Sequence, residues 1–313
     1  MDRHSGVAPD LKEELKLEQK QQPALSVHDR DVARHFDDWT DDFYIKWWHV
    51  DHVHFGLFEG SESLVKSEFR ADSKEFARGL ERMIEAIVAP VMIEKDHHVV
   101  DAGCGIGGTA IYLAKTRGCM VTGVNVSTRQ LEIARQKAAE AGLEQRVGFE
   151  YGNCSRSLPI ASDSVDVVIN IESACQYSDR GRFLREVRRI LKPGGRIVAT
   201  DWLMSDGLTA SQIETYIRPM YEPWALQSME SPSSYIPLLR NAGLKVLEFE
   251  GFNGKDSDNP RLLQESYRML KGLEFCWLMP ARVRPMMEKV RTLEVAWSNK
   301  CFELGRYCAV KSE

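Results

Sequence analysis

The chain has 313 residues, a formal net charge of −5 and hydrophobic residues at 43% of its positions. This length accommodates one large core, or one domain with an elaboration, but not three domains. Its Lys and Arg residues are scattered among Asp and Glu, which argues against a nucleic-acid partner.

Cysteine usage and hydropathy indicate the compartment. The seven cysteines are widely spaced and form no CxxC pair, which argues against a disulfide framework and a structural zinc site. The first residues, MDRHSGVAPDLKEELKLEQKQQP, are charged and lack the apolar stretch of a secretion signal. No run of about 18 apolar residues occurs that would predict a membrane span. We therefore expect a cytoplasmic protein.

The N-terminal third divides into two parts. Residues 1–25 are rich in Lys, Glu and Gln and are expected to form a flexible tail, or an isolated helix that becomes ordered only on a partner. Residues 26–94 are expected to form N-terminal helices and an aromatic lid. The first helix begins at a capping box of Ser26 and Asp29. Its apolar face contains Val32, Phe36, Trp39, Phe43 and Trp47 at helical spacing. The segment KWWHVDHVHFGLFEG predicts a loop over a pocket, and another helix is expected over residues 76–87.

The remainder, residues 95–313, is expected to be the main domain. Five apolar, β-branched runs predict strands, namely VVDAG, MVTGVNV, VGFEYG, VDVVINI and RIVATDW. Between them, helical periodicity appears near residues 108–117, 128–141 and 180–191. This alternation is typical of a doubly wound parallel sheet. Helical cap insertions are expected at about 205–243 and 259–296, and KVLEFEGF and CFELGRYCAVK predict two further strands.

A glycine-rich turn, VVDAGCGIGG, follows the first strand. Its glycines allow the chain to turn tightly and its backbone to approach a ligand. The turn also satisfies the GxGxxG fingerprint of dinucleotide oxidoreductases, but three features argue against that alternative. Asp101 before the first glycine suits a cationic ligand and would repel a pyrophosphate. Asn125 stands where NAD-binding proteins usually carry an acid, and LKPGGRIVATDWL follows about 90 residues later.

These segments together resemble a known motif series. D-x-G-C-G-x-G, LPIASDSVDVVINIES and LREVRRILKPGGR are similar to the motifs of class I S-adenosylmethionine (SAM) methyltransferases, over roughly residues 95–203. The resemblance implies an α/β, Rossmann-like fold with a mostly parallel seven-stranded sheet flanked by helices, a helical substrate cap, and SAM as cofactor. It places around SAM the residues Asp101, Gly103, Cys104, Gly105, Gly107, Asn125, Val126, Ser127, Gln130, Asn153, Cys154 and Asn170.

The resemblance includes two departures from the family pattern. The acid that commonly binds both ribose hydroxyls is Asn125 here, and the Gly-Asp pair that commonly contacts adenine is Gly152 followed by Asn153. An amide can still donate one hydrogen bond and accept another. We therefore expect SAM binding to persist with altered contacts.

Glu172 is the main catalytic candidate. It follows the fourth strand, and the carboxyl ends of parallel strands line the ligand crevice. The stretch INIESACQYSDRGRFLREVRRILKPGG is similar to sterol, tocopherol and geranyl diphosphate C-methyltransferases and to related N- and O-methyltransferases. In the C-methylating members a carboxylate near this place acts as a base or stabilises a cation, because methylation of an alkene leaves a carbocation. Alternatively, Glu172 caps the next segment or binds SAM.

His54 and Tyr177 complete the catalytic candidates. His54 lies in an HFG segment that recurs in similar methyltransferases, although a hydrogen-bonded loop histidine is an equal alternative. Relatives commonly carry a His two residues before the acid corresponding to Asp179, and this chain has Tyr177 there. The missing histidine argues against simple O-methylation.

Aromatic residues define the expected substrate site. Their faces stabilise positive charge and exclude water, and the candidates are Trp47, Trp48, Phe55 and Trp224. Phe36, Trp39 and Phe43 are expected to pack in the core instead. The HVDHVH segment lacks the spacing of a metal site, so no metal is expected.

Together these features predict SAM-dependent methylation of a small molecule. The first hypothesis is C-methylation of an alkene in a prenylated or terpenoid natural product. The alternatives are N- or O-methylation of a specialised metabolite and a non-catalytic SAM-binding scaffold. Exchange of the N-terminal segment between subunits would give a homo-oligomer.

Overall fold

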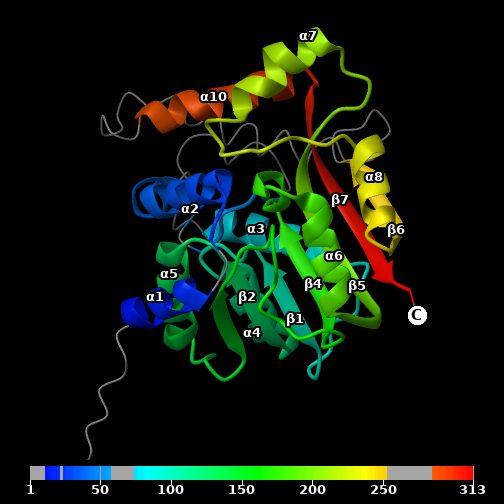
Figure 1. The fold of residues 1–313 in the computed structure, drawn as a ribbon. Helices are drawn as coiled ribbons and strands as arrows, with labels where there is room; N and C mark the ends of the chain where they lie inside the picture. Colours follow the sequence, from blue (N-terminus) through cyan, green and yellow to red (C-terminus); the bar gives the residue numbers. More distant parts are fainter. Residues whose placement is uncertain (1–10, 22–23, 50, 58–73, 252–283, 313) are drawn as a thin grey trace, which may run out of the picture.

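A twisted seven-stranded sheet forms the centre of the molecule (Figure 1). The computed structural model describes residues 11–21, 24–49, 51–57, 74–251 and 284–312. The strands are β1 (His98–Ala102), β2 (Met120–Asn125), β3 (Val147–Tyr151), β4 (Val165–Ile171), β5 (Leu191–Met204), β6 (Leu244–Gly251) and β7 (Phe302–Lys311). Their order is β3-β2-β1-β4-β5-β7-β6, with β7 antiparallel to both neighbours and the other pairs parallel. The predicted mostly parallel sheet is confirmed.

The strands form because apolar, β-branched residues can be buried on both faces of the sheet. In β1, Val99 belongs to the core on one face and Val100 to the core on the other. In β4, Val167 and Val168 alternate in the same way. β5 begins earlier than the predicted RIVATDW run, because Leu191 already pairs with Val165 before a bulge.

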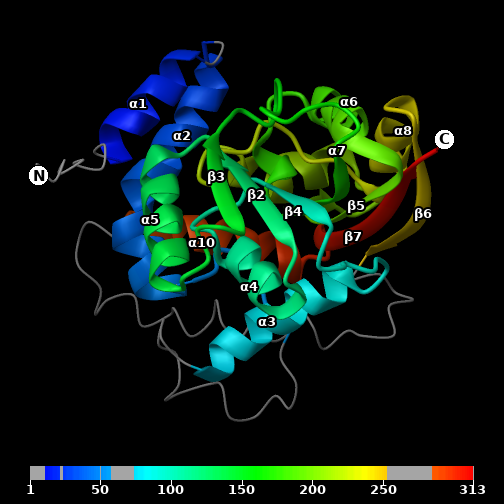
Figure 2. The same ribbon diagram turned by 90° about the horizontal axis from the view of Figure 1, so that it is seen from below.

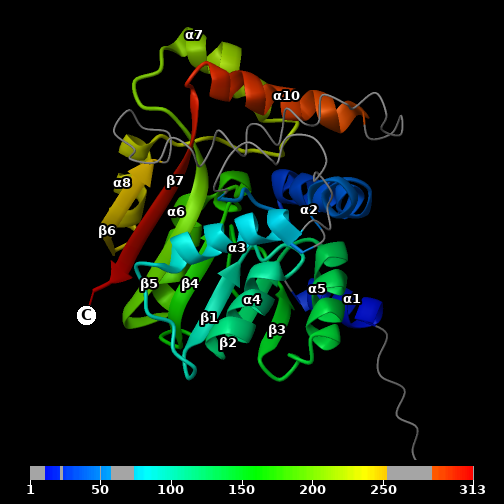
Figure 3. The same cartoon turned by 180° about the vertical axis from the view of Figure 1, so that it is seen from behind.

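Helices cover the two faces of the sheet. Figure 3 shows α3 (Lys74–Val88) and α4 (Gly108–Arg117) on one face, with α5 (Thr128–Glu140) toward β3. Figure 1 shows α6 (Arg180–Ile190) and α8 (Pro232–Asn241) on the other face. Helices α4, α5 and α6 confirm the three helices that were predicted between the strands. Among the described residues, no helix is long and apolar enough to cross a membrane.

The N-terminal segment packs onto this domain beside α5 (Figure 2). Residues 11–21 lie within the tail that we predicted to be flexible, yet they form helix α1 (Leu11–Gln21). Leu15 is buried in the core, and Glu18 pairs with Arg135 at 2.7 Å and accepts a hydrogen bond from the backbone of Tyr151. An apolar contact and a placed carboxylate therefore hold a segment whose overall composition indicates disorder.

Helix α2 (Val27–Trp39) begins at the predicted capping box. The backbone of Asp29 donates to Ser26 Oγ at 3.1 Å, and the backbone of Ser26 donates to Asp29 Oδ2 at 3.3 Å. The apolar face continues past the α-helix into a π-helix, η1 (Thr40–Trp48), where Phe43 and Tyr44 are buried. The wider turn of a π-helix is frequently found at functional sites.

The cap lies beyond the carboxyl ends of the parallel strands. Within the described residues, it consists of four short helices and one longer helix. These are η2 (Ala174–Gln176), α7 (Ala210–Gln212), η3 (Ile213–Ile217), η4 (Arg218–Met220) and the longer α10 (Arg284–Ser298). Figures 1 and 3 both show α7 and α10 together at this end of the molecule. Of the predicted cap insertion at 205–243, the first part contains α7, η3 and η4, whereas its last helix, α8, covers the sheet instead. Part of the second predicted insertion, residues 259–283, lies outside the described residues.

Candidate active site

A cleft of about 400 Å³, here called the cofactor cleft, opens at the carboxyl ends of the central strands beneath α2. It is lined by Asp29, Val32, Phe36, Gly103, Asn125, Val126, Gly152, Asn153, Cys154, Ser155, Ser173, Gln176 and Tyr177. Gly103 adopts a positive φ of 79°, and a Cβ there would lie 1.9 Å from Ser173 Oγ. Gly105 has open space beside it, so its bare backbone can approach a ligand.

A second cleft of about 310 Å³ adjoins the first at Gly103 and contains Asp101 and Gly105. We call it the Asp101 cleft. Burial raises the pKa of Asp101 to about 7, and its Oδ2 has no hydrogen-bond partner in the structure. A buried carboxylate oxygen without a partner is costly unless a ligand supplies one. The cationic ammonium of the methionine part of SAM fits that requirement.

Asn125 stabilises the glycine turn. Its Nδ2 donates to the carbonyl of Gly105 at 3.2 Å and to Gln130 Oε1 at 2.8 Å. Gln130 in turn donates to Thr40 Oγ1 of the π-helix at 3.1 Å. Asn125 also lines the cofactor cleft. Gln130 is buried, and its bond to Thr40 joins α5 to the N-terminal helices.

Ser127 has a similar linking position. It caps α5 by accepting a hydrogen bond from Gln130 N, and its hydroxyl donates to Asp37 of α2 at 2.6 Å. The backbone of Arg129 donates to the same carboxylate oxygen. Ser127 and Gln130 are therefore close to the cleft without lining it.

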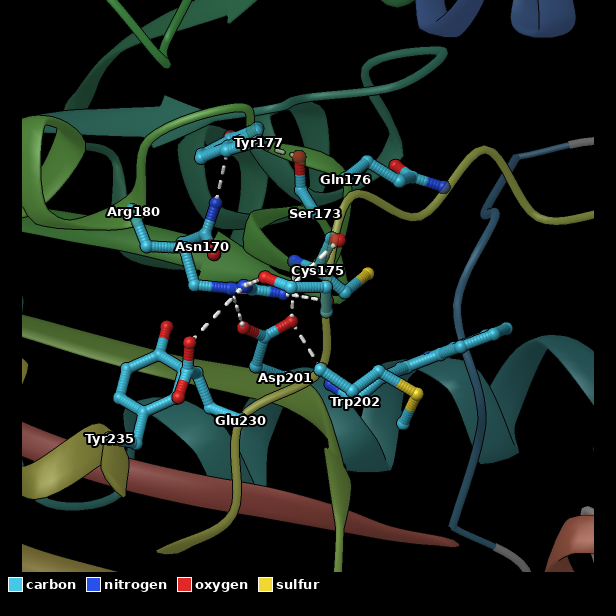
Figure 4. A network of polar contacts seen from close by, with 12 residues as sticks. Asn170, Ser173, Cys175, Gln176, Tyr177, Arg180, Asp201, Trp202, Glu230 and Tyr235 are labelled. Atoms are coloured by element: carbon cyan, nitrogen blue, oxygen red, sulfur yellow. Dashed lines mark hydrogen bonds and ion pairs between the residues drawn. The ribbon is translucent and has the colours of Figure 1, made fainter. Parts of the chain in front are cut away.

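The Tyr177 hydroxyl belongs to a small group of hydrogen-bonded polar side chains at the cofactor cleft. Asn170 donates to the Tyr177 hydroxyl at 3.1 Å and to the carbonyl of Ala102 at 2.7 Å, and Ser173 donates to Tyr177 at 2.9 Å (Figure 4). Tyr177 and Cys154 line the cleft, and Cys104 lines the Asp101 cleft. Asn170 is fully buried behind them, and Gly107 caps the N-terminus of α4.

A third pocket, of about 480 Å³, is largely aromatic and is called the substrate pocket here. It is lined by Phe36, Phe43, Tyr44, Val53, His54, Phe55, Glu172, Gln176, Trp202, Trp224 and Leu293. Phe36 and Gln176 also line the cofactor cleft, so the two spaces share a wall. Trp202 stacks beside Phe55 and meets Trp224 edge to face, with ring centroids 5.9 and 5.2 Å away.

Glu172 is the one carboxylate among the residues that line the substrate pocket. The backbone of Phe55 donates to its Oε1 at 2.8 Å, and Trp202 Nε1 donates to its Oε2 at 2.9 Å. Burial, together with the negative charge of nearby Asp201, raises the pKa of Glu172 to about 8 despite these two donors. Its φ of 49° is unusual for a residue with a side chain and marks a constrained backbone.

His54 lies between the substrate pocket and the Asp101 cleft and lines both. Its Nδ1 is 2.7 Å from the carbonyl of Phe55. Burial lowers the pKa of His54 to about 4, so the ring is neutral at physiological pH. His52 packs edge to face on it, and His49 stacks on His52. The histidines thus form a row of packed rings.

Of the predicted substrate-binding residues, the structure places Phe55 and Trp224 at the pocket. The side chains of Trp47 and Trp48 lie outside the described residues. Phe36 and Phe43, expected in the core, belong to the core and also line the pocket. The catalytic, cofactor-binding and substrate-binding roles of all these residues stay predictions.

Three features of the site are not indicated by the sequence pattern, namely the pocket positions of Trp202 and Tyr44 and the cleft position of Asp29. Trp202 stands near the carboxyl end of β5, where the crevice rule that selected Glu172 also applies. Asp29 was recognised only as a helix cap. Tyr44 is buried and hydrogen-bonded to His35, and its sequence position gave no sign of the pocket.

A buried polar network around Asp201, drawn in Figure 4, includes Trp202, which donates a hydrogen bond to Glu172. Asp201 accepts hydrogen bonds from the backbone of Cys175 at 2.8 Å and of Trp202 at 3.0 Å. Arg180 lies 3.6 Å from Asp201 and donates to the carbonyl of Ser228 in the cap at 2.6 Å. Asp201 thereby fixes both the loop that follows Glu172 and the tryptophan that binds it.

Known proteins share this architecture. The family model of the methyltransferase domain matches residues 100–199. The methyltransferase GfsG of Streptomyces halstedii is 34% identical over 202 residues, which are 64% of this chain and 68% of that protein. The sarcosine/dimethylglycine N-methyltransferase of Halorhodospira halochloris is 30% identical over 211 residues, covering 67% and 70% of the two chains.

A solved structure is similar over nearly the whole fold. It is the geranyl diphosphate C-methyltransferase from Streptomyces coelicolor A3(2), in complex with Mg²⁺, geranyl diphosphate and S-adenosyl-L-homocysteine (SAH). The TM-score is 0.71 at 18% identity, with 92% of this chain and 100% of that chain covered. The fold, the glycine turn, the orphaned Asp101 oxygen and these relatives agree: the chain belongs to the class I SAM-dependent methyltransferases and methylates a small molecule with SAM as cofactor.

Proposed function

We propose that this enzyme methylates an alkene carbon of a prenylated or terpenoid natural product, with Glu172 as cation stabiliser and base. The observation that carries the proposal is the position of Glu172. Its carboxyl group is held by two donors inside an aromatic pocket that shares a wall with the cofactor cleft. The geranyl diphosphate C-methyltransferase has the same fold and, by its name, acts on a prenyl compound.

SAM, when bound, supplies an electrophilic methyl group. The alkene π electrons would form the new carbon–carbon bond to that methyl group while its bond to sulfur breaks. Sulfur would keep the electron pair of that bond and leave as SAH, and the adjacent carbon of the alkene would be left with a positive charge. The faces of Trp202 and Trp224 and the negative charge of Glu172 stabilise that cation. The Glu172 carboxylate then accepts a proton from a neighbouring carbon, and the electrons of that C–H bond form the new double bond.

This role requires Glu172 to be ionised. With a pKa of about 8, the carboxyl is mostly protonated at neutral pH in the absence of other charges. A nearby positive charge favours the ionised form of a carboxyl group. The sulfonium of SAM supplies such a charge, so cofactor binding and deprotonation of Glu172 favour each other.

N-methylation is the second candidate. A carboxylate among aromatic rings also suits an amine, and the relative from Halorhodospira halochloris is by name an N-methyltransferase. O-methylation is less favoured, because the Tyr177 hydroxyl is held by Asn170 and Ser173 in the cofactor cleft and does not line the substrate pocket. A SAM-binding scaffold would bind SAM without turnover.

Replacement of Glu172 by Gln separates these candidates. We expect Glu172→Gln to lower alkene methylation by about 100-fold or more, because general-base catalysis contributes about that much. Binding of SAH should stay within threefold of wild type. Glu140→Gln, which neutralises an exposed carboxylate on α5, is the matched control and should keep full activity. Full activity of Glu172→Gln on an amine would support the N-methylation candidate and contradict our proposal.

A further inference from the structure

The two positions where the family commonly carries acids for the nucleoside are amides in this chain. Asn125 uses its Nδ2 within the protein, on Gly105 and Gln130. Asn153 accepts a hydrogen bond from the backbone of Ser155 with its Oδ1 at 2.9 Å, which leaves its Nδ2 donor turned elsewhere. That nitrogen is buried with no partner at full hydrogen-bond distance, and the Asn153 side chain lies beside the Asp29 carboxylate, whose pKa it lowers. These two positions therefore offer the nucleoside a donor at Asn153 but no carboxylate.

Helix α2 brings a carboxylate to the same cleft. Asp29 projects from the first turn of α2, is 3% exposed and lines the cofactor cleft together with Asn153. Burial raises the pKa of Asp29, but the polar side chains of Ser26, Asn153 and Ser178 lower it by more. Asp29 is therefore ionised at neutral pH and can accept hydrogen bonds from a ligand.

The three pockets orient the cofactor. The ammonium of SAM belongs at the buried Asp101 oxygen, and its methyl group must face the pocket of Glu172. Gly103 lines both the Asp101 cleft and the cofactor cleft, so it marks the joint between them. The adenosine must then occupy the cofactor cleft, where Asp29 of α2 and Asn153 of the loop after β3 lie beside each other.

We propose that Asp29 and Asn153 together recognise the edge of the adenine base, with Asp29 accepting from the 6-amino group and Asn153 Nδ2 donating to a ring nitrogen. The 6-amino group is a donor and the adjacent ring nitrogen is an acceptor. A hypoxanthine base has the opposite pattern, with a 6-oxo acceptor and a ring N–H donor. A site that pairs with a particular donor or acceptor strongly rejects an analogue lacking it. Through Asp29, helix α2 thus determines which nucleoside the cofactor cleft accepts.

The experiment compares binding of SAH and of S-inosyl-L-homocysteine by isothermal titration calorimetry. The wild-type protein should bind SAH at least tenfold more tightly than the inosyl analogue. Asp29→Asn should weaken SAH and strengthen the analogue, because an amide can donate to the 6-oxo group. The preference should then fall to threefold or less. The readout is independent of the acceptor molecule, so failure of the alkene proposal leaves it intact.

Two further variants test whether Asp29 acts only through the stability of α2. Ser26→Ala breaks the capping box but keeps the carboxylate, and Asp37→Asn removes a different carboxylate from the same helix. Both should weaken the two ligands equally and leave the preference unchanged. Equal weakening of both ligands by Asp29→Asn would overturn the proposal, since a structural role of the cap affects both alike.

Discussion

At the scale of single residues, the site contains two buried carboxyl groups, Asp101 in the Asp101 cleft and Glu172 in the substrate pocket. Asp101 lacks a partner for one oxygen, whereas both oxygens of Glu172 already accept hydrogen bonds. Burial raises the pKa of each, to about 7 for Asp101 and about 8 for Glu172. Asp101 is thus suited to bind a fixed positive charge, and Glu172 to meet a charge that appears during the reaction.

Asp101→Asn tests the first of these roles. The ammonium of the ligand binds the ionised form, so SAH affinity of the wild-type protein should fall as pH falls through about 7. We expect a decrease of more than tenfold between pH 7.5 and 5.5. The variant should bind about 10- to 100-fold more weakly at pH 7.5, since a hydrogen bond to a charged group is worth about 1.5–3 kcal/mol.

Calorimetric titrations over this pH range provide the measurement. The variant should show little dependence on pH, because an amide does not titrate. A wild-type affinity that is flat from pH 7.5 to 5.5, or that rises on acidification, would show that Asp101 does not bind the ammonium.

At the scale of elements, α2 connects stability to the site. Its capping box fixes the N-terminus, and Asp29, Val32 and Phe36 on its inner face line the cofactor cleft. His28 also contacts the carbonyl of Gln176 at 2.8 Å, on the loop between the two pockets. The helix is therefore both a structural element and the roof of the cleft.

Ser26→Ala should lower the free energy of unfolding by about 1 kcal/mol, the usual cost of losing an N-cap. Urea denaturation monitored by circular dichroism measures this change. SAH should recover part of the loss at saturating concentration, because a ligand that binds only the folded state stabilises it. Stability equal to wild type would show that the capping box contributes nothing to α2.

Much of this architecture follows from local sequence patterns. The β-branched runs of β1 and β4 and the Ser26 capping box predicted their elements, because burial on both faces and an N-cap leave local signals. The docking of α1 could not be predicted, since it depends on Leu15 and Glu18 meeting partners far along the chain. The π-helix η1 could not be predicted either, because its apolar residues continue the spacing of an ordinary α-helix and only its hydrogen-bond register differs.

The candidate site divides in the same way. The glycine turn and Glu172 are visible because both follow strands at the carboxyl edge of the sheet. The positions of Asp29 in the cofactor cleft, and of Phe36 in both the cofactor cleft and the substrate pocket, depend on tertiary packing. A helical spacing shows that Phe36 is buried, but it does not show which space the ring faces.

At the scale of the whole molecule, the cap and the sheet are joined around the substrate pocket. Arg180 on α6 binds the Ser228 carbonyl of the cap and lies beside Asp201 of β5 (Figure 4). Glu230 of the cap lies 3.8 Å from the same guanidinium. Breaking a buried ion pair costs several kcal/mol, so this junction is expected to keep the cap in one position.

The N-terminal segment contributes to the same closure. α1 and α2 pack on α5 and β3 of their own chain through Leu15, Glu18 and Asp37. Exchange of this segment between subunits, and the homo-oligomer that it would produce, stay predictions. In either arrangement the segment would bring Asp29 and Phe36 to the site.

The central claim is that the methyl group goes to carbon. The most direct test incubates the protein with SAM carrying a ¹³C-labelled methyl group and a panel of prenylated metabolites, prenyl diphosphates, phenols and amines. Mass spectrometry identifies the methylated product, and ¹³C NMR gives the atom that carries the label. We predict a label on a former alkene carbon, whereas a label on nitrogen or oxygen would contradict the account.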